Sequence, residues 1–375
     1  MIDLHKMEQT LRRLNVTFIS GVPDTLLNDF CLHIENNWDQ NNHVIAANEG
    51  NAVGLAAGHQ MATGDVPLVY MQNSGIGNAM NPLISLTHPS VYGVPMILLI
   101  GWRGNPEGKD HPQHTKQGVL TPILMEDVDI PWRKLSNSDD GVESDLIWAV
   151  ETAKVSNSPV ALIVPKGVLE RGEKSGFEDD LKLMSREEAI HALVEAMESD
   201  TIFVASTGRA TRELYEVRRL RGEPHCNDFL NVGAMGHTSS IATGIAIGRP
   251  ERSVVCIDGD AAALMHLGAF PVNAQLKQCK KFLHVVLNNG VHESVGGQNS
   301  ATAQISLHEI AKTSGYKVGD KQIISAKGLV AEIESIKKND GQGPYFIEVL
   351  IRKGMRSDMP VLKFDLQEHR QAFLS

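Results

Sequence analysis

Short apolar runs alternate with helical patterns along most of the chain. The runs that we expect to form strands are VTFISGV (16–22), HVIAA (43–47), PLVYMQ (67–72), PMILLIG (95–101), PVALIVP (159–165), TIFVAST (201–207), SVVCIDG (253–259), FLHVVLNN (282–289) and YFIEVLI (345–351). Several are continuously apolar, as expected for strands that are covered on both faces. Because helical stretches separate them, the pattern predicts an α/β fold of mainly parallel sheets flanked by helices.

A polar, charge-rich stretch, LERGEKSGFEDDLKLMSREEAI (169–190), separates the first five of these strands from the last four. We interpret its first part as a linker. Ser185 and Glu188 have the spacing of a capping box, which predicts that a helix begins there. The sequence therefore predicts two domains, 1–175 and 185–375, joined by a linker at 170–185 and with no middle domain between them.

Composition excludes several classes of protein. The formal net charge of −10 argues against non-specific nucleic-acid binding, which needs a basic surface. No apolar run reaches the roughly 18 residues that a membrane span needs. The first residues, MIDLHKMEQTLRRL (1–14), predict an amphipathic helix rather than a secretory signal. No two cysteines have CxxC spacing, so we expect reduced thiols in a cytoplasmic protein, without a disulfide framework or a cysteine zinc site: Cys31, Cys226, Cys256 and Cys279.

Two polar turns follow neighbouring apolar runs in the second half of the chain. Asp260 comes directly after 253–259, and Asn289 follows 29 residues later at the end of 282–289. Ligands of parallel α/β sheets gather beyond the carboxyl ends of strands, and a carboxylate beside a phosphate requires a cation such as Mg2+ between them. The alternative interpretation is a helix cap at Asp260 and a plain turn at Asn289.

The sequence GDA (259–261), followed by NN (288–289), resembles the diphosphate-binding motif of thiamine-diphosphate-dependent enzymes. The resemblance implies that thiamine diphosphate binds with Mg2+. The metal ligands would be Asp260, Asn289 and the Val291 carbonyl, and the diphosphate would be lined by Gly259, Ala261 and Ala262. Ala261 stands where this family usually has glycine.

Two further segments resemble parts of the same family. ANEGNAVGLAAGHQMATG (47–64) matches the segment whose glutamate, here Glu49, contacts N1′ of the aminopyrimidine. NVGAMGHTSSIATGIAIG (231–248) matches the segment beneath the thiazolium ring, with Met235 as the bulky apolar residue, Gly233 as a carbonyl acceptor and Gly236 beside them. The alternatives are a packed helix that begins with a glutamate and a glycine-rich turn.

Almost the whole chain resembles the short, two-domain decarboxylases of 3-phosphonopyruvate, whose near relatives act on sulfopyruvate. The motifs are GVPDTLLNDF (21–30), NSGIGNAMNPL (73–83), GWRGNPEGKDHPQHTKQG (101–118) and NNGVHESVGGQ (288–298). The resemblance implies an enzyme of phosphonate biosynthesis that acts on a small anionic 2-oxo acid. Such a substrate needs cationic donors. The candidates are Arg103, Lys109, His114 and, from a C-terminal segment, Arg356.

Other residues are candidates for proton transfer and cofactor contact. Asp24, His114 and His292 are the candidate proton donors, and Asn73 is expected to face the thiazolium ring. In this family the cofactor lies between two subunits, which implies a homodimer or a larger assembly. Three alternatives stay open: a sulfopyruvate decarboxylase, a related carboligase, and a catalytically silent α/β ligand-binding protein.

Overall fold

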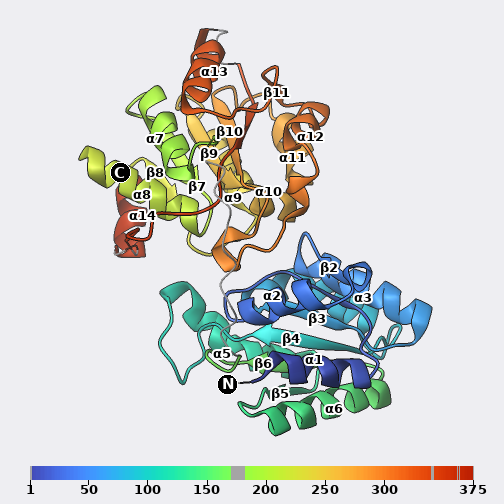
Figure 1. Cartoon of the computed structure of the whole chain (residues 1–375). Coiled ribbons are helices and arrows are strands. Elements are labelled where there is room, and N and C mark those ends of the chain that lie inside the picture. Colours follow the sequence, from blue (N-terminus) through green and yellow to red (C-terminus); the bar gives the residue numbers. More distant parts are fainter. Residues whose placement is uncertain (1, 170–181, 339–341, 361, 363, 375) are drawn as a thin grey trace. The chain divides into compact units, whose positions relative to one another are not determined.

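The computed structural model describes residues 2–169, 182–338, 342–360, 362 and 364–374. Most of the predicted linker, 170–181, lies outside the described residues. The chain divides into two compact units, shown in Figure 1. Unit 1 comprises Met1–Ser175 and Val295–Gln298, and unit 2 comprises Gly176–Ser294 and Asn299–Ser375.

Unit 1 is built on a six-stranded parallel sheet in the order β2-β1-β3-β4-β6-β5. Its strands are β1 (Ile19–Gly21), β2 (His43–Ile45), β3 (Leu68–Gln72), β4 (Met96–Gly101), β5 (Trp132–Lys134) and β6 (Pro159–Val164). Its helices are α1 (Leu4–Arg13), α2 (Asn28–Asn37), α3 (Glu49–Thr63), α4 (Ile76–Pro82), α5 (Pro112–Asp127) and α6 (Asp139–Ser156). Helices α1, α2 and α6 share one apolar core with the sheet, and α3, α4 and α5 share the core on its other face.

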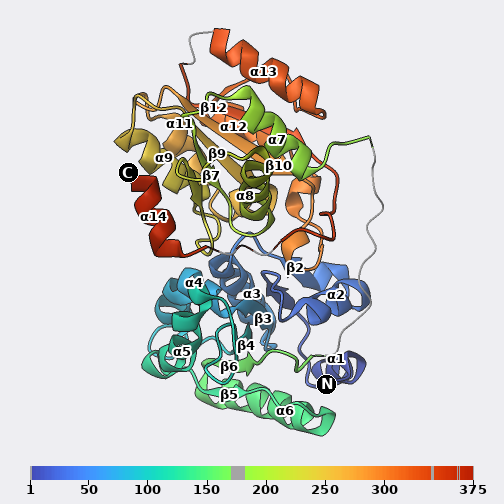
Figure 2. The ribbon, with the colours of Figure 1, turned by 90° about the vertical axis from the view of Figure 1, so that its left-hand side faces the viewer.

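Unit 2 repeats this plan, with a six-stranded parallel sheet in the order β11-β12-β10-β9-β7-β8. Its strands are β7 (Ile202–Ala205), β8 (Asp228–Leu230), β9 (Val254–Gly259), β10 (Phe282–Asn288), β11 (Lys317–Val318) and β12 (Tyr345–Leu350). Its helices are α7 (Arg186–Ala196), α8 (Arg209–Arg221), α9 (Thr238–Gly248), α10 (Asp260–Met265), α11 (Ala269–Ala274), α12 (Leu307–Ser314), α13 (Ala326–Lys338) and α14 (Leu366–Leu374). Helices α7, α8 and α13 pack on one face, and α9, α11 and α12 pack on the other (Figure 2).

The predicted α/β fold is confirmed, and each of the nine predicted strands coincides with an observed one. The sequence reading missed β5, β8 and β11, which are two or three residues long and lie at sheet edges. The predicted capping box is present, because the Ser185 side chain accepts a hydrogen bond from the Glu188 backbone N–H. Among the described residues, no helix is both long enough and apolar enough to cross a membrane.

Candidate active site

Glu49 is the first residue of α3, after the short connection that follows β2, and its side chain is fully buried. One carboxyl oxygen, Oε2, accepts a hydrogen bond of 2.7 Å from Asn78 Nδ2. The other, Oε1, is buried without a hydrogen-bond partner. A Cβ atom at position 75 would lie 2.2 Å from Oε1, so only glycine fits there. Burial raises the pKa of Glu49 against the opposing effect of the Asn78 hydrogen bond.

The unpartnered oxygen of Glu49 is the observation that tests the expected cofactor in unit 1. Leaving a buried polar atom without a partner costs free energy, so native proteins seldom do it without a ligand or a functional reason. A ring nitrogen that donates or shares a proton would satisfy Oε1. The geometry of Glu49 therefore fits the role that the resemblance implies for it at the aminopyrimidine.

A second group of polar residues lies at the carboxyl ends of β3 and β4. Asn73 Nδ2 donates to the Arg103 carbonyl and to Thr121 Oγ1, both at 2.8 Å, and Asn73 Oδ1 accepts from the Arg103 N–H at 3.2 Å. Arg103 in turn donates to Thr25 Oγ1 at 2.9 Å. Asn73 thus fixes the backbone that presents Arg103, and whether it also faces a thiazolium ring stays a prediction.

Asp110 organises the loop between β4 and α5, and sequence reasoning missed it. Its carboxylate accepts hydrogen bonds from Arg103 Nε (2.8 Å) and from His114 Nδ1 (2.9 Å), as well as from backbone N–H groups. Burial opposes ionisation, but the bonds from Arg103 and His114 hold the pKa of Asp110 well below its usual range. The signal in the sequence was a pair of acidic residues, Glu107 and Asp110, among the cationic side chains of 101–118.

The environment of His114 changes its expected chemistry. Burial lowers the pKa of His114, although Asp110 acts in the opposite direction. Near neutral pH it therefore presents a neutral imidazole, whereas the sequence suggested a cation. With Nδ1 donating to Asp110, Nε2 is left as an acceptor. Lys109 is exposed on the same loop.

Asp24 follows β1 and is buried, with its Oδ2 accepting a bond of 3.1 Å from the Leu26 N–H. A Cβ at position 101 would lie 2.1 Å from the same oxygen, so Gly101 makes room for this carboxyl. Burial raises the pKa of Asp24 to about 6, while the charge of Arg103 acts in the opposite direction. A carboxyl with this pKa is able to exchange a proton near neutral pH.

In unit 2 the structure brings Asp260 and Asn289 together. Strands β9 and β10 are parallel neighbours, with Gly259 level with Leu287, so the turns that follow them lie side by side. Asp260 is buried and accepts a hydrogen bond from Thr302 Oγ1. Burial raises the pKa of Asp260 to about 6 against the opposing effect of that bond. A cation beside this carboxylate would offset the cost of burying its charge.

The backbone around this turn is open where the resemblance places a diphosphate. A Cβ at Gly259 would meet no atom within 4 Å. Ala261 and Ala262 follow in the first turn of α10 and are half-buried. Val291 donates its N–H to Asn289 Oδ1 at 3.2 Å, which holds the turn closed. Small residues and free space therefore fit a bound phosphate group and its cation.

Glu293 accepts a hydrogen bond from the Asn289 side chain, and sequence reasoning assigned Glu293 no role. Its Oε2 accepts a hydrogen bond of 2.6 Å from Asn289 Nδ2, which leaves the amide oxygen to face away from Glu293. Arg186 contacts the same carboxylate at 2.5 Å, and Arg209 donates to its other oxygen. The Gly354 N–H adds a bond of 2.8 Å. Glu293 is thus a buried carboxylate that fixes one orientation of the candidate metal ligand.

The remaining candidates in unit 2 have varied surroundings. Met235 is half-buried and donates its N–H to the Gly233 carbonyl at 2.9 Å. Gly236 has φ +73, a conformation that favours glycine, and a Cβ there would lie 2.7 Å from Met265 Cβ. Burial lowers the pKa of His292 to about 4, so its imidazole is neutral near pH 7.

Arg356 lies in an ion-pair cluster. Its guanidinium contacts Glu216 at 2.9 Å, Asp358 at 2.9 Å and Glu187 at 3.1 Å. Three carboxylates already compensate its charge, so a role in binding the substrate would require breaking these contacts. That role stays a prediction.

Family models match both halves of the chain. The model described as "Thiamine pyrophosphate enzyme, N-terminal TPP binding domain" matches residues 5–122. The model described as "Thiamine pyrophosphate enzyme, C-terminal TPP binding domain" matches residues 206–349. These segments hold Glu49 and the Asp260–Asn289 pair, respectively.

Curated relatives cover most of the chain. A phosphonopyruvate decarboxylase of Streptomyces hygroscopicus is 30% identical over 94% of this chain and 88% of its own. A sulfopyruvate decarboxylase of Methanosarcina acetivorans is 27% identical over 87% of this chain and 85% of its own. The beta subunit of a sulfopyruvate decarboxylase of Methanothermobacter thermautotrophicus is 32% identical over 51% of this chain and 95% of its own.

Proposed function

The chain belongs to the family of thiamine pyrophosphate enzymes, and from this membership we propose that it converts 3-phosphonopyruvate to phosphonoacetaldehyde and CO2. Its family and relatives make it a 2-oxo acid decarboxylase, a carboxy-lyase. The observation that carries the choice of substrate is the near full-length similarity to phosphonopyruvate decarboxylases. This similarity exceeds, in identity and in coverage, the similarity to the single-chain sulfopyruvate decarboxylase.

Thiamine diphosphate supplies, when bound, the nucleophilic carbon and the electron sink that decarboxylation of a 2-oxo acid requires. Glu49 would hold the pyrimidine through Oε1, its unpartnered oxygen. Asp260, Asn289 and the Val291 carbonyl would hold Mg2+, which prefers oxygen ligands together with phosphate. Glu293 holds the Asn289 amide nitrogen, so the amide oxygen would remain available to the cation.

Proton transfer and charge recognition fall to residues at the strand ends of unit 1. Asp24, with a pKa of about 6, would supply the proton that replaces the departing carboxylate. Arg103 would bind an anionic group of the substrate, and Asp110 sets the direction of its guanidinium. His114 and His292, both neutral, would act as hydrogen-bonding partners rather than as fixed cations.

The proposal includes self-association, because the family resemblance implies that two copies complete each cofactor site. The occurrence of separate alpha and beta subunits among the sulfopyruvate relatives supports an assembly. Exposed apolar side chains on unit 1 also support it: Leu55 and Met61 on α3, and Val119 and Ile123 on α5.

The experiment that tests the proposed reaction measures aldehyde release from 3-phosphonopyruvate, 3-sulfopyruvate and pyruvate, with thiamine diphosphate and Mg2+ present. We expect the highest kcat/KM with 3-phosphonopyruvate. A preference for 3-sulfopyruvate would replace the proposed substrate while keeping the reaction class. Cofactor binding without turnover of any of the three would favour a carboligase or a silent binding protein.

Substituting Arg103 is expected to impair recognition of the second anion. Arg103→Ala should raise KM for 3-phosphonopyruvate by about 10- to 100-fold, the effect of losing one charge-assisted hydrogen bond, and should change KM for pyruvate much less. Steady-state kinetics with both substrates measure the difference. Lys134→Ala is the matched control, because the Lys134 side chain forms an ion pair of 2.6 Å with the exposed Glu107 of the Arg103 loop. Equal changes for both substrates would exclude the assigned role of Arg103.

Substituting Glu293 is expected to weaken the magnesium site through Asn289. Glu293→Gln should raise the Mg2+ concentration needed for half-maximal cofactor binding by about 10-fold, as is typical when a group that orients a metal ligand is changed. Calorimetric titration of thiamine diphosphate at several Mg2+ concentrations measures this without any turnover. Glu213→Gln is the control, since Glu213 is also buried beside Arg186, at 3.5 Å, but belongs to α8. If both variants shift the Mg2+ dependence alike, Glu293 acts only through the general stability of the network.

A further inference from the structure

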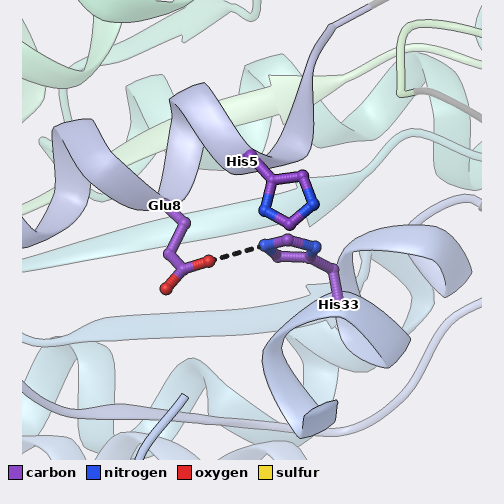
Figure 3. Close-up of side chains that lie close together, drawn as sticks. All are labelled: His5, Glu8 and His33. Atoms are coloured by element: carbon purple, nitrogen blue, oxygen red, sulfur yellow. Dashed lines mark hydrogen bonds and ion pairs between the residues drawn. The ribbon is translucent and has the colours of Figure 1, made fainter. Parts of the chain in front are cut away.

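Outside the candidate active site, two histidines and a glutamate from α1 and α2 converge on one point. His5 and Glu8 lie one turn apart on α1, and His33 faces them from α2 (Figure 3). Each offers one ligand atom, and these three atoms lie within 4.8 Å of one another. The rings of His5 and His33 meet edge to face, with centroids 4.7 Å apart. The cluster thus presents two imidazoles and a carboxylate from two separate helices.

Two of the three side chains are held in place before any ligand binds. The side chains of His33 and Glu8 are only 10% and 13% exposed, and His33 Nε2 lies 2.8 Å from Glu8 Oε2. Arg12 contacts the second oxygen of the carboxylate at 2.9 Å and stacks over Trp38, which fixes the orientation of Glu8. His5 is exposed, so an ion can reach the cluster from solvent. Such an arrangement reduces the conformational entropy that binding would cost.

We propose that His5, Glu8 and His33 bind a divalent cation of the late first transition series, with Zn2+ as the representative ion. Imidazole nitrogen and carboxylate oxygen are its usual ligands at about 2.0–2.2 Å, and three protein ligands plus water complete a tetrahedron. The cation takes the place of the hydrogen bond between Glu8 and His33. Mg2+ does not compete, because it prefers oxygen ligands and keeps its water. The bound ion joins α1 to α2 on one face of the unit 1 sheet.

The simpler explanation is an ion pair between Glu8 and His33 alone. That pair does not require His5. In the structure, however, a His5 ring nitrogen lies within 4.8 Å of the ligand atoms of Glu8 and His33 (Figure 3). The two explanations therefore differ in the effect of removing His5. The ion pair alone predicts no specific zinc binding that depends on His5, whereas the three-ligand site predicts zinc binding that is largely lost without His5.

The test is calorimetric titration of the full chain with Zn2+ while Mg2+ is saturating. The chain contains 15 histidines, so stoichiometry alone does not identify the site and substitutions must. We expect one site that His5→Gln and His33→Gln each weaken by about 100-fold, since even indirect partners of a metal ligand contribute 10- to 100-fold. His191→Gln is the control, because His191 is an exposed histidine with one carboxylate, that of the exposed Glu195, at 3.6 Å among the described residues. It should leave the titration unchanged.

Melting temperature provides a second measurement. Zn2+ should raise the melting temperature of the parent protein, and of His191→Gln, but not that of His5→Gln, because the ion binds only the folded arrangement of the two helices. Because His5 is exposed, its substitution should leave the fold intact, and circular dichroism checks this. Absence of zinc binding in the parent, or equal binding in His5→Gln, would overturn the proposal. Neither measurement depends on decarboxylase activity.

Discussion

Glu49→Gln is expected to lower kcat for decarboxylation by about 1,000-fold, the range associated with loss of a positioned acid–base group. Glutamine keeps the size of the side chain and can still contact Asn78, but it cannot exchange a proton with a ring nitrogen at the position of Oε1. The unpartnered state and complete burial of that oxygen carry the prediction. Steady-state kinetics of aldehyde release, with saturating cofactor and Mg2+, measure it.

Glu49→Gln is also expected to change the pH dependence of the protein's stability. Because burial raises the pKa of Glu49 above its ordinary value of 4.5, the folded state disfavours the ionised form. Its ionisation therefore destabilises the folded protein increasingly as pH rises above 4.5. Without cofactor, Glu49→Gln should melt at or above the parent temperature near pH 7, and the difference should shrink toward pH 4. Near-normal turnover would refute the role of Glu49, while a lower melting temperature near pH 7 would refute the account of its burial.

Sequence patterns predicted the parts of the molecule that depend on local chemistry and regular topology. The continuously apolar runs became central strands because both faces of each sheet are covered. The adjacency of Asp260 and Asn289 followed from two consecutive parallel strands, which pair as neighbours. Both features depend on the order of residues along the chain and on the parallel direction of the strands, which a sequence pattern can indicate.

The residues that sequence reasoning missed act through side-chain contacts that no sequence pattern indicates. Glu293 meets Arg186, which is 107 positions away, and no periodicity relates the two. Asp110 lies within its loop, but only the folded loop shows that its carboxylate accepts bonds from both Arg103 and His114. The sequence pointed to His114 as a candidate polar residue of the site, but it did not predict that the imidazole would be neutral. Burial, which lowers the pKa of His114, is visible only in the folded structure.

The two carboxylates at the end of β9 have different environments, and this separates their expected roles. Asp258 is fully buried within the sheet, where its Oδ2 lies 3.7 Å from His284 Nε2. Asp260 lies on α10, next to Thr302 and beside the Asn289 turn. Asp258 is still part of β9 and is buried beside His284, whereas Asp260 begins α10 in the turn beyond the strand, beside the Asn289 turn, so we expect Asp260 to meet the cation of the cofactor.

Asp260→Ala should therefore weaken Mg2+-dependent binding of thiamine diphosphate by at least about 100-fold, more than the loss expected for an indirect partner such as Glu293. Asp260→Asn should give an intermediate loss, because it keeps one neutral oxygen ligand and the contact with Thr302. Calorimetric titration of the cofactor with and without Mg2+ measures both variants. Asp258→Asn is the matched control: it neutralises the neighbouring carboxylate and should change the melting temperature without changing the Mg2+ dependence. If cofactor affinity is the same in Asp260→Ala as in the parent, or falls equally in Asp258→Asn, the cation does not lie where the spacing of these two strands places it.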